Sequence, residues 1–216
     1  MSIAVKICGI TTPEALDAAI SGGADYIGLV FFARSPRHLE IDRARELADL
    51  ARGRVKIVTL TVDASDESLQ EIVDEISPDA FQLHGHETPE RVAEIKRKFG
   101  RTVIKAIPVA TAKDAERAAD YAGVADLILF DAKAGLGAIL PGGNGRTFDW
   151  AALDGIADIP PFMLSGGLDA DNVAAAIERT GPVAVDVSSG VELAPGIKDP
   201  EKIRRFLQAA KTGKQT

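Results

Sequence analysis

The chain has 216 residues, a formal net charge of −7 from 25 basic and 32 acidic side chains, and a single cysteine. Such a length allows a sizeable core, and we expect one catalytic domain spanning residues 1–216. The acidic balance argues against broad binding of nucleic acid or anionic membranes. One cysteine forms no internal disulfide, and no apolar run approaches the roughly 18 residues of a membrane span. The N-terminal residues do not resemble a signal peptide, so we expect a cytoplasmic protein.

Short aliphatic runs recur along the chain, and each is followed by a helical pattern. The runs begin near Ala4, Tyr26, Val55, Ala80, Val103, Leu127, Phe162 and Val183. Three helix starts combine an N-cap residue with a following proline and an acidic residue, at Thr12–Glu14, Thr88–Glu90 and Asp199–Glu201. Eight strand–helix units in this length predict an α/β fold, a single-domain (β/α)8 TIM barrel. An open doubly wound sheet is the alternative, because periodicity does not show closure.

One predicted connection is unusually long. Residues 131–147, between Phe130 and Phe148, are rich in glycine and exceed the few residues typical of a strand-to-helix loop. We interpret the segment as a lid over a substrate, and a disordered insertion is the alternative.

Polar residues gather where the predicted strands end, which is where a barrel places its active site. Because residues two apart in a strand share a face, Lys6 should share a face with Cys8, and Gln82 with His84. By the same rule Leu127, Leu129 and Asp131 share a face, as do Ala184 and Asp186, whereas Val5, Ile7, Phe81, Phe130 and Val185 should face the helices. The polar groups at the barrel mouth need partners or a ligand to offset their desolvation.

Two of these residues are candidates for proton transfer. Cys8 is either a small buried hydrophobe or a base, and the nearby Lys6 ammonium would favour its thiolate. Asp131 begins the long loop, and it is either a cap or salt-bridge partner of Lys133, or a general acid.

Glycines after the seventh and eighth strands carry the clearest binding signal. Gly166-Gly167 and Ser188-Ser189-Gly190 would let backbone N–H groups approach a phosphate monoester, although tight turns alone also explain them. Arg37 is suited to clamp a carboxylate, or else lies on a solvated loop. His84 and His86 either serve the site or are structural. We find no metal-ligand spacing, P-loop or dinucleotide fingerprint, so we expect no cofactor and a phosphorylated small-molecule substrate. A thiol and a carboxyl at one mouth favour isomerisation over hydrolysis.

Five segments resemble phosphoribosylanthranilate isomerase, the cofactor-independent isomerase of tryptophan biosynthesis. They are Val5–Thr11, Ser35–Arg37, Gln82–Gly85, Pro141–Trp150 and Val185–Glu192, the last with Pro195-Gly196 and Lys198-Asp199. The resemblance therefore runs from the first strand to the last helix. Asn144 and Ser165 depart from the usual family residues, which leaves details of the lid and phosphate loops open.

The resemblance implies an aldose–ketose isomerase of (β/α)8 fold. Such an enzyme converts N-(5′-phosphoribosyl)anthranilate into 1-(2-carboxyphenylamino)-1-deoxyribulose 5-phosphate by an Amadori rearrangement. Cys8 matches the general base, Asp131 the general acid and Arg37 the residue that holds the anthranilate carboxylate. Gly166, Gly167, Ser189 and Gly190 match the phosphate loops, and His84 and Asp186 have supporting, substrate-binding roles. The quaternary state is expected to be a monomer or a homodimer.

Two other functions remain open from the sequence. Another phosphate-binding barrel enzyme, such as indole-3-glycerol-phosphate synthase, would require a catalytic Lys/Glu set that we do not align here. A non-catalytic binding protein that kept the barrel would not need Cys8 and Asp131.

Overall fold

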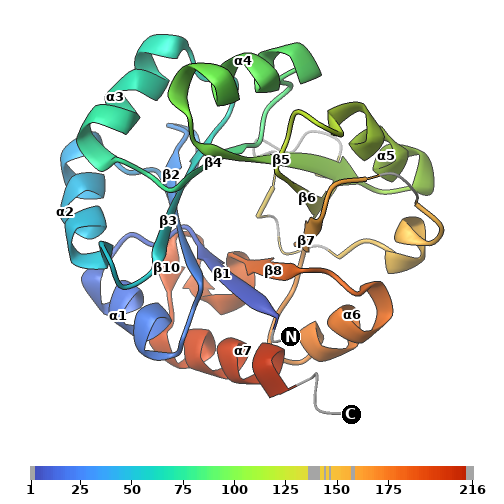
Figure 1. Cartoon of the computed structure of the whole chain (residues 1–216). Helices are drawn as coiled ribbons and strands as arrows, with labels where there is room; N and C mark the ends of the chain where they lie inside the picture. The colour runs from blue at the N-terminus through green and yellow to red at the C-terminus, as the bar shows by residue number, and fades with distance from the viewer. Residues whose placement is uncertain (1–2, 136–141, 144, 146, 157–158, 213–216) are drawn as a thin grey trace.

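Eight parallel strands form a closed barrel in the computed structural model, which describes residues 3–135, 142–143, 145, 147–156 and 159–212 (Figure 1). The strands are β1 (Ala4–Cys8), β2 (Tyr26–Phe31), β3 (Lys56–Thr61), β4 (Ala80–Leu83), β5 (Thr102–Val109), β6 (Leu127–Ala132), β7 (Phe162–Leu164) and β8 (Ala184–Val187). Pairing of β1 with β8 closes the barrel, with Lys6 beside Asp186 in the register. The predicted (β/α)8 barrel is therefore confirmed, and the open sheet is excluded.

Helices surround the barrel and follow most of its strands (Figure 1). They are α1 (Pro13–Ser21), α2 (Ile41–Ala51), α3 (Asp66–Ile76), α4 (Pro89–Phe99), α5 (Ala112–Glu116), α6 (Val173–Thr180) and α7 (Pro200–Thr212). The side chains of Thr12 and Thr88 cap α1 and α4 as the sequence predicts, each accepting a backbone N–H. The sixth unit differs, because the described residues between β6 and β7 contain a 3-10 helix, η2 (Trp150–Leu153), rather than an α-helix.

Two further 3-10 helices and a short hairpin complete the described fold. The 3-10 helix η1 (Arg117–Tyr121) follows α5, and η3 (Ser189–Val191) follows β8. The antiparallel strands β9 (Glu192–Ala194) and β10 (Ile197–Lys198) form a hairpin between η3 and α7. This hairpin places Glu192 and Lys198 at the C-terminal end of the barrel.

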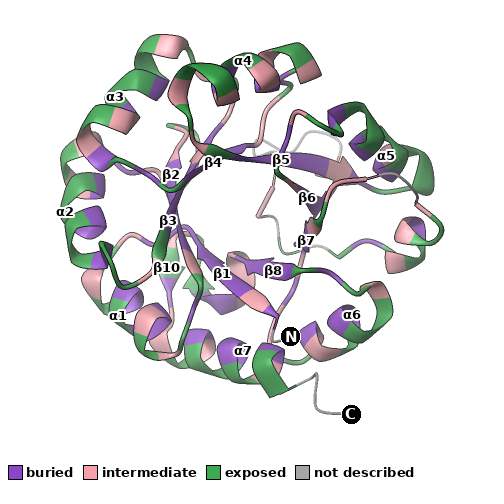
Figure 2. Ribbon diagram, viewed as in Figure 1, coloured by how far each residue is buried: buried purple, intermediate pink, exposed green. Residues whose placement is uncertain are grey.

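The apolar core has two layers, one inside the barrel and one between the barrel and the helices. Val58, Leu129 and Met163 belong to the inner cluster. The outer cluster includes the predicted helix-facing residues Val5, Ile7, Phe81, Phe130 and Val185. Buried residues accordingly occupy the strands and the inner helix faces, and exposed residues the outer helix faces (Figure 2).

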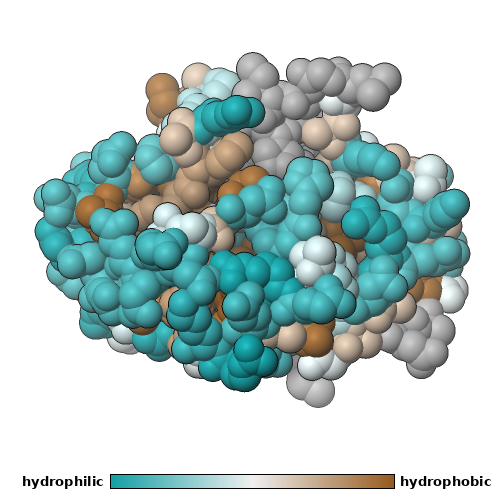
Figure 3. Space-filling view, turned by 90° about the horizontal axis from the view of Figure 1, so that it is seen from above, coloured by the Kyte–Doolittle hydropathy of each residue, from teal (hydrophilic) through white to brown (hydrophobic). Residues whose placement is uncertain are grey.

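The face of the molecule that is seen from above is mainly polar (Figure 3). Figure 3 shows one face, on which hydrophilic side chains predominate and hydrophobic ones are scattered. None of the helices in the described residues is long and apolar enough to cross a bilayer.

Candidate active site

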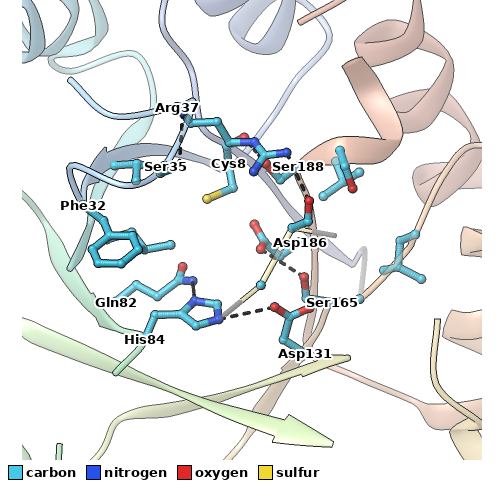
Figure 4. A pocket seen from close by; sticks show the side chains of 18 of the residues that line it. Cys8, Phe32, Ser35, Arg37, Gln82, His84, Asp131, Ser165, Asp186 and Ser188 are labelled. Carbon is cyan, nitrogen blue, oxygen red and sulfur yellow. Dashed lines mark hydrogen bonds and ion pairs between the residues drawn. The ribbon is translucent and has the colours of Figure 1, made fainter. Parts of the chain in front are cut away.

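A pocket lies at the C-terminal ends of the barrel strands (Figure 4). Eight of the nine predicted site residues line it: Cys8, Arg37, His84, Asp131, Gly166, Gly167, Asp186 and Ser189. The ninth, Gly190, packs against Leu168, which itself lines the pocket. Barrel closure thus brings together side chains from both ends of the sequence.

Cys8 reaches the pocket because its neighbour on β2 is a glycine. The β1–β2 register pairs Cys8 with Gly28. A Cβ atom at Gly28 would lie 2.8 Å from the Cys8 Sγ and 3.1 Å from the Lys6 Nζ, which is too close for an ordinary contact. The missing side chain therefore makes room for both the thiol and the ammonium inside the barrel.

Lys6 forms a buried ion pair with Asp186 beneath the thiol. The Lys6 Nζ lies 2.8 Å from Asp186 Oδ1, and the hydroxyl of Ser165 donates to Asp186 Oδ2 at 3.2 Å. Burial acts to lower the pKa of Lys6, but the charge and hydrogen bond of Asp186 together with those of Cys8 outweigh it, and the pKa is raised. Lys6 is thus held as a cation inside the barrel.

Lys6 favours the thiolate of Cys8, as expected from the sequence, but burial opposes it more strongly. Burial raises the pKa of the Cys8 thiol, and the nearby Asp186 carboxylate raises it further. Lys6 lowers the pKa of Cys8, but not enough to offset the desolvation. The thiol is therefore the resting form at neutral pH.

Asp131 lies at the end of β6 and contacts His84 rather than Lys133. Its Oδ2 is 3.3 Å from the Nε2 of His84, and its Oδ1 accepts the Ala132 N–H at 2.9 Å. Lys133 instead pairs with Asp114, so the predicted alternative of an Asp131–Lys133 salt bridge is wrong.

His84 is oriented by Gln82, its neighbour on the same strand face. The Gln82 side-chain amide lies 3.1 Å from the Nδ1 of His84. With the Gln82 N–H donating, Nδ1 accepts, and the His84 proton sits on Nε2, directed at Asp131. Figure 4 shows this chain of contacts from Gln82 through His84 to Asp131.

The long loop after β6 returns to this part of the pocket. A Cβ atom at Gly142 would lie 2.2 Å from Asp131 Oδ2 and 2.8 Å from His84 Nε2, so a larger residue there would displace one of these side chains. Of the lid predicted for residues 131–147, residues 136–141, 144 and 146 lie outside the described residues.

Arg37 is buried at the edge of the pocket, and the alternative of a solvated loop is wrong. Its Nε and Nη2 each donate to the Glu192 carboxylate at 2.8 Å, and Nη2 also donates to the Gly143 carbonyl at 3.2 Å. Gly9 makes room for the stem of the arginine, since a Cβ there would lie 2.6 Å from the Arg37 Cδ. Burial opposes the charge, but the hydrogen bonds to Glu192 raise the pKa of Arg37.

The glycine loops after β7 and β8 pack against each other at the pocket. Gly166 and Gly167 both adopt positive φ, of 90° and 63°, which favours glycine. A Cβ at Gly190 would lie 2.0 Å from the carbonyl oxygen of Leu168, so close packing of the two loops also requires glycine. Both loops therefore bring bare backbone to the pocket.

The positions of several residues in this region could not be predicted from the sequence. His86, a weak candidate, is exposed and contacts Asp63 rather than the pocket. In the sequence Glu192 and Lys198 stand out only as members of the segments that resemble the family, and nothing there indicates that both side chains are buried at the hairpin. Among the described residues, no group of three or more His, Cys, Asp or Glu side chains is arranged to hold a metal ion.

The family model for N-(5′-phosphoribosyl)anthranilate (PRA) isomerase matches residues 5–209 of this chain. A relative in Rhodopseudomonas palustris (strain BisA53), named N-(5′-phosphoribosyl)anthranilate isomerase, is 54% identical over 211 residues, covering 98% of this chain and 97% of its own.

Solved structures agree with the sequence match. Phosphoribosylanthranilate isomerase from Thermotoga maritima aligns with a TM-score of 0.88 at 37% identity, covering 97% of this chain and 99% of its own. A phosphoribosylanthranilate isomerase in complex with reduced 1-(o-carboxyphenylamino)-1-deoxyribulose 5-phosphate aligns with a TM-score of 0.85 at 34% identity, with the same coverage. This chain belongs to the N-(5′-phosphoribosyl)anthranilate isomerase family.

Proposed function

We propose that this protein catalyses the Amadori rearrangement of N-(5′-phosphoribosyl)anthranilate to 1-(2-carboxyphenylamino)-1-deoxyribulose 5-phosphate, with Cys8 as general base and Asp131 as general acid. The observation that carries the proposal is that both groups line one pocket, on different strands. In Figure 4 the thiol and the carboxyl lie on different sides of the pocket, with Asp186 between them. A ligand between them would have one proton donor and one acceptor within reach.

The first step is protonation of the furanose ring oxygen by Asp131. The C1′–O bond then breaks as the anilino nitrogen supplies its electron pair, which gives an open-chain iminium ion. His84, whose Nε2–H is directed at Asp131, stabilises the carboxylate left by this step. Gly142 lies over the same carboxyl and helps to exclude water from it.

The second step is removal of the C2′ proton by the Cys8 thiolate. The C–H electrons form the enolamine, which tautomerises to the ketone. Because burial raises the pKa of Cys8, the fraction of thiolate is small at neutral pH. The Lys6 ammonium directly below is the group that stabilises the thiolate once it forms.

The remaining pocket residues account for the substrate's two anionic ends. Arg37 would hold the anthranilate carboxylate. Gly166, Gly167 and Ser189 would bind the phosphate with backbone N–H groups and a hydroxyl, and Gly190 supports their loops. Asp186 is proposed to contact the substrate's sugar while it anchors Lys6.

The test is to incubate the purified protein with N-(5′-phosphoribosyl)anthranilate and follow the loss of its fluorescence. The expected result is conversion to the ketose product, which is an isomer of equal mass and is identified by chromatography and by borohydride trapping. A protein that leaves the substrate at its uncatalysed rate of decay would overturn the proposal.

A further inference from the structure

Glu192 forms a bidentate ion pair with the Arg37 guanidinium from outside the pocket. The bonds from Nε to Oε1 and from Nη2 to Oε2 are both 2.8 Å, a parallel arrangement that fixes the plane of the guanidinium. Both side chains are buried. Arg37 lines the substrate pocket, whereas Glu192 lines only the neighbouring hollow beside the β9–β10 hairpin. The carboxylate therefore backs the arginine without facing the ligand.

Lys198 holds Glu192 in turn. Its Nζ lies 2.7 Å from Glu192 Oε1 and also donates to the Ser188 carbonyl at 2.9 Å and hydroxyl at 3.1 Å. The Ser188 hydroxyl donates to the Cys8 carbonyl at 3.1 Å. If Glu192 turned away from Arg37, the buried Lys198 ammonium would lose its carboxylate partner. The Glu192–Arg37 ion pair is therefore fixed with respect to the catalytic end of β1.

The bidentate ion pair leaves part of the Arg37 guanidinium available to a ligand. An arginine has five N–H donors, and among the described residues Nε and Nη2 are engaged by Glu192 and the Gly143 carbonyl. The two Nη1 donors are the ones left for a ligand. With the plane fixed from behind, their direction is set before any ligand arrives, which lowers the ordering cost of binding.

We propose that Glu192 is a positioning residue that gives the pocket its preference for an aryl amine carrying a carboxylate, by fixing the direction of the Arg37 Nη1 donors. The proposal rests on the proposed function, in which Arg37 receives that carboxylate. It assigns to a hairpin residue outside the pocket a share of substrate selectivity.

For the Glu192→Gln variant, an argument from charge alone and the positioning proposal predict opposite changes in the binding of an anionic ligand. Arg37, Glu192 and Lys198 together carry a net charge of +1. Glu192→Gln removes the negative charge, and even if the buried Lys198 then releases its proton the local charge stays at +1. On charge alone, an anionic ligand should bind the variant at least as well. On positioning, the same ligand should bind the variant more weakly.

The experiment measures binding by calorimetry with two stable ligands that differ only in the carboxylate. One is reduced 1-(o-carboxyphenylamino)-1-deoxyribulose 5-phosphate, and the other is its phenylamino counterpart. For Glu192→Gln we expect the dissociation constant of the first to rise about tenfold and that of the second to stay within about twofold. Turnover should show a raised KM with kcat within about threefold of the wild type.

Two controls keep the test sharp. Glu201→Gln, on the exposed first turn of α7, makes the same chemical change and should alter neither constant. Adding Glu192→Gln to Arg37→Ala should cause no further loss, because a residue that acts through Arg37 has no effect without it.

Other outcomes would overturn either the positioning role of Glu192 or the proposed function. Equal weakening of both ligands by Glu192→Gln would indicate a general structural role and would overturn the inference. Unchanged or tighter binding of the carboxylate ligand would do the same. If the wild type bound neither ligand, the proposed function would fail instead.

Discussion

Replacing Lys6 with methionine tests the buried ion pair beneath the active site. Methionine has similar length and fits an apolar barrel interior, but it removes the ammonium that lies 2.8 Å from Asp186. The Asp186 carboxylate is only 4% exposed, and the Ser165 hydroxyl is then its side-chain donor among the described residues. A buried charge loses its counter-charge while most of the packing is kept.

The expected cost follows from that geometry. Removal of one partner of a buried ion pair destabilises a protein by about 3–5 kcal/mol, because the other charge stays buried. A typical domain is stable by about 5–15 kcal/mol, so the Lys6→Met variant should fold but unfold at markedly lower denaturant. In the double variant Lys6→Met/Asp186→Asn the residual charge is gone, and we expect at least half of the loss to be recovered.

Urea unfolding followed by circular dichroism measures both variants, with the slope m showing whether the transitions are comparable. A loss below about 1 kcal/mol for Lys6→Met, or a double variant no more stable than the single one, would refute the reasoning. The rate of Cys8 alkylation, measured as a function of pH, tests the effect of the Lys6 charge independently. Since Lys6 lowers the pKa of Cys8, its removal should move the alkylation midpoint to higher pH.

Three further outcomes follow from the same site. Burial lowers the pKa of Lys198 from 10.5 to about 8, so between pH 8 and 10.5 the unfolded chain binds a proton that the folded chain does not. Stability should therefore rise with pH across this window by about 3 kcal/mol, and urea titrations of Lys198→Met should lack that gain. Gly142→Ala places a methyl group 2.2 Å from the Asp131 carboxylate, and steady-state kinetics should show kcat lowered by more than about tenfold with the fold intact by circular dichroism. Finally, kcat/KM should rise with pH above neutrality as the Cys8 thiol ionises, and a flat pH–rate profile would argue against a thiolate base.

The barrel could be predicted from the sequence because its signals are local. The predicted strand starts lie within one residue of those observed, since the aliphatic runs are bounded by turn residues and most are followed by a helix. The sixth unit was the exception. The apolar residues near Trp150 form only a 3-10 helix, and the long glycine-rich loop before it carries no helical period.

The candidate site was predictable only as far as strand ends and strand faces allow. Alternation placed Cys8, Asp131 and Asp186 toward the interior, because side-chain direction in a strand follows from sequence position. Partners across the barrel were not accessible in this way. Lys6 and Asp186 are 180 residues apart, and Arg37 and Glu192 are 155 apart, and only closure of the barrel brings them together.

The direction of the pKa shift of Cys8 also could not be predicted without the structure. Proximity to Lys6 suggested a lowered pKa, but complete burial and the Asp186 carboxylate together outweigh that attraction. A sequence shows which groups are neighbours along a strand, whereas desolvation depends on everything that packs around them.

The most direct test of the central claim is the turnover of N-(5′-phosphoribosyl)anthranilate by Cys8→Ser and Asp131→Asn beside the wild type, followed by substrate fluorescence. General acid and base groups contribute about 10²–10⁴-fold each, so we expect each variant to lose at least about a hundredfold in kcat while remaining folded. A wild type that turns over the substrate while either variant keeps near-full activity would contradict the assignment of Cys8 and Asp131 as the base and the acid.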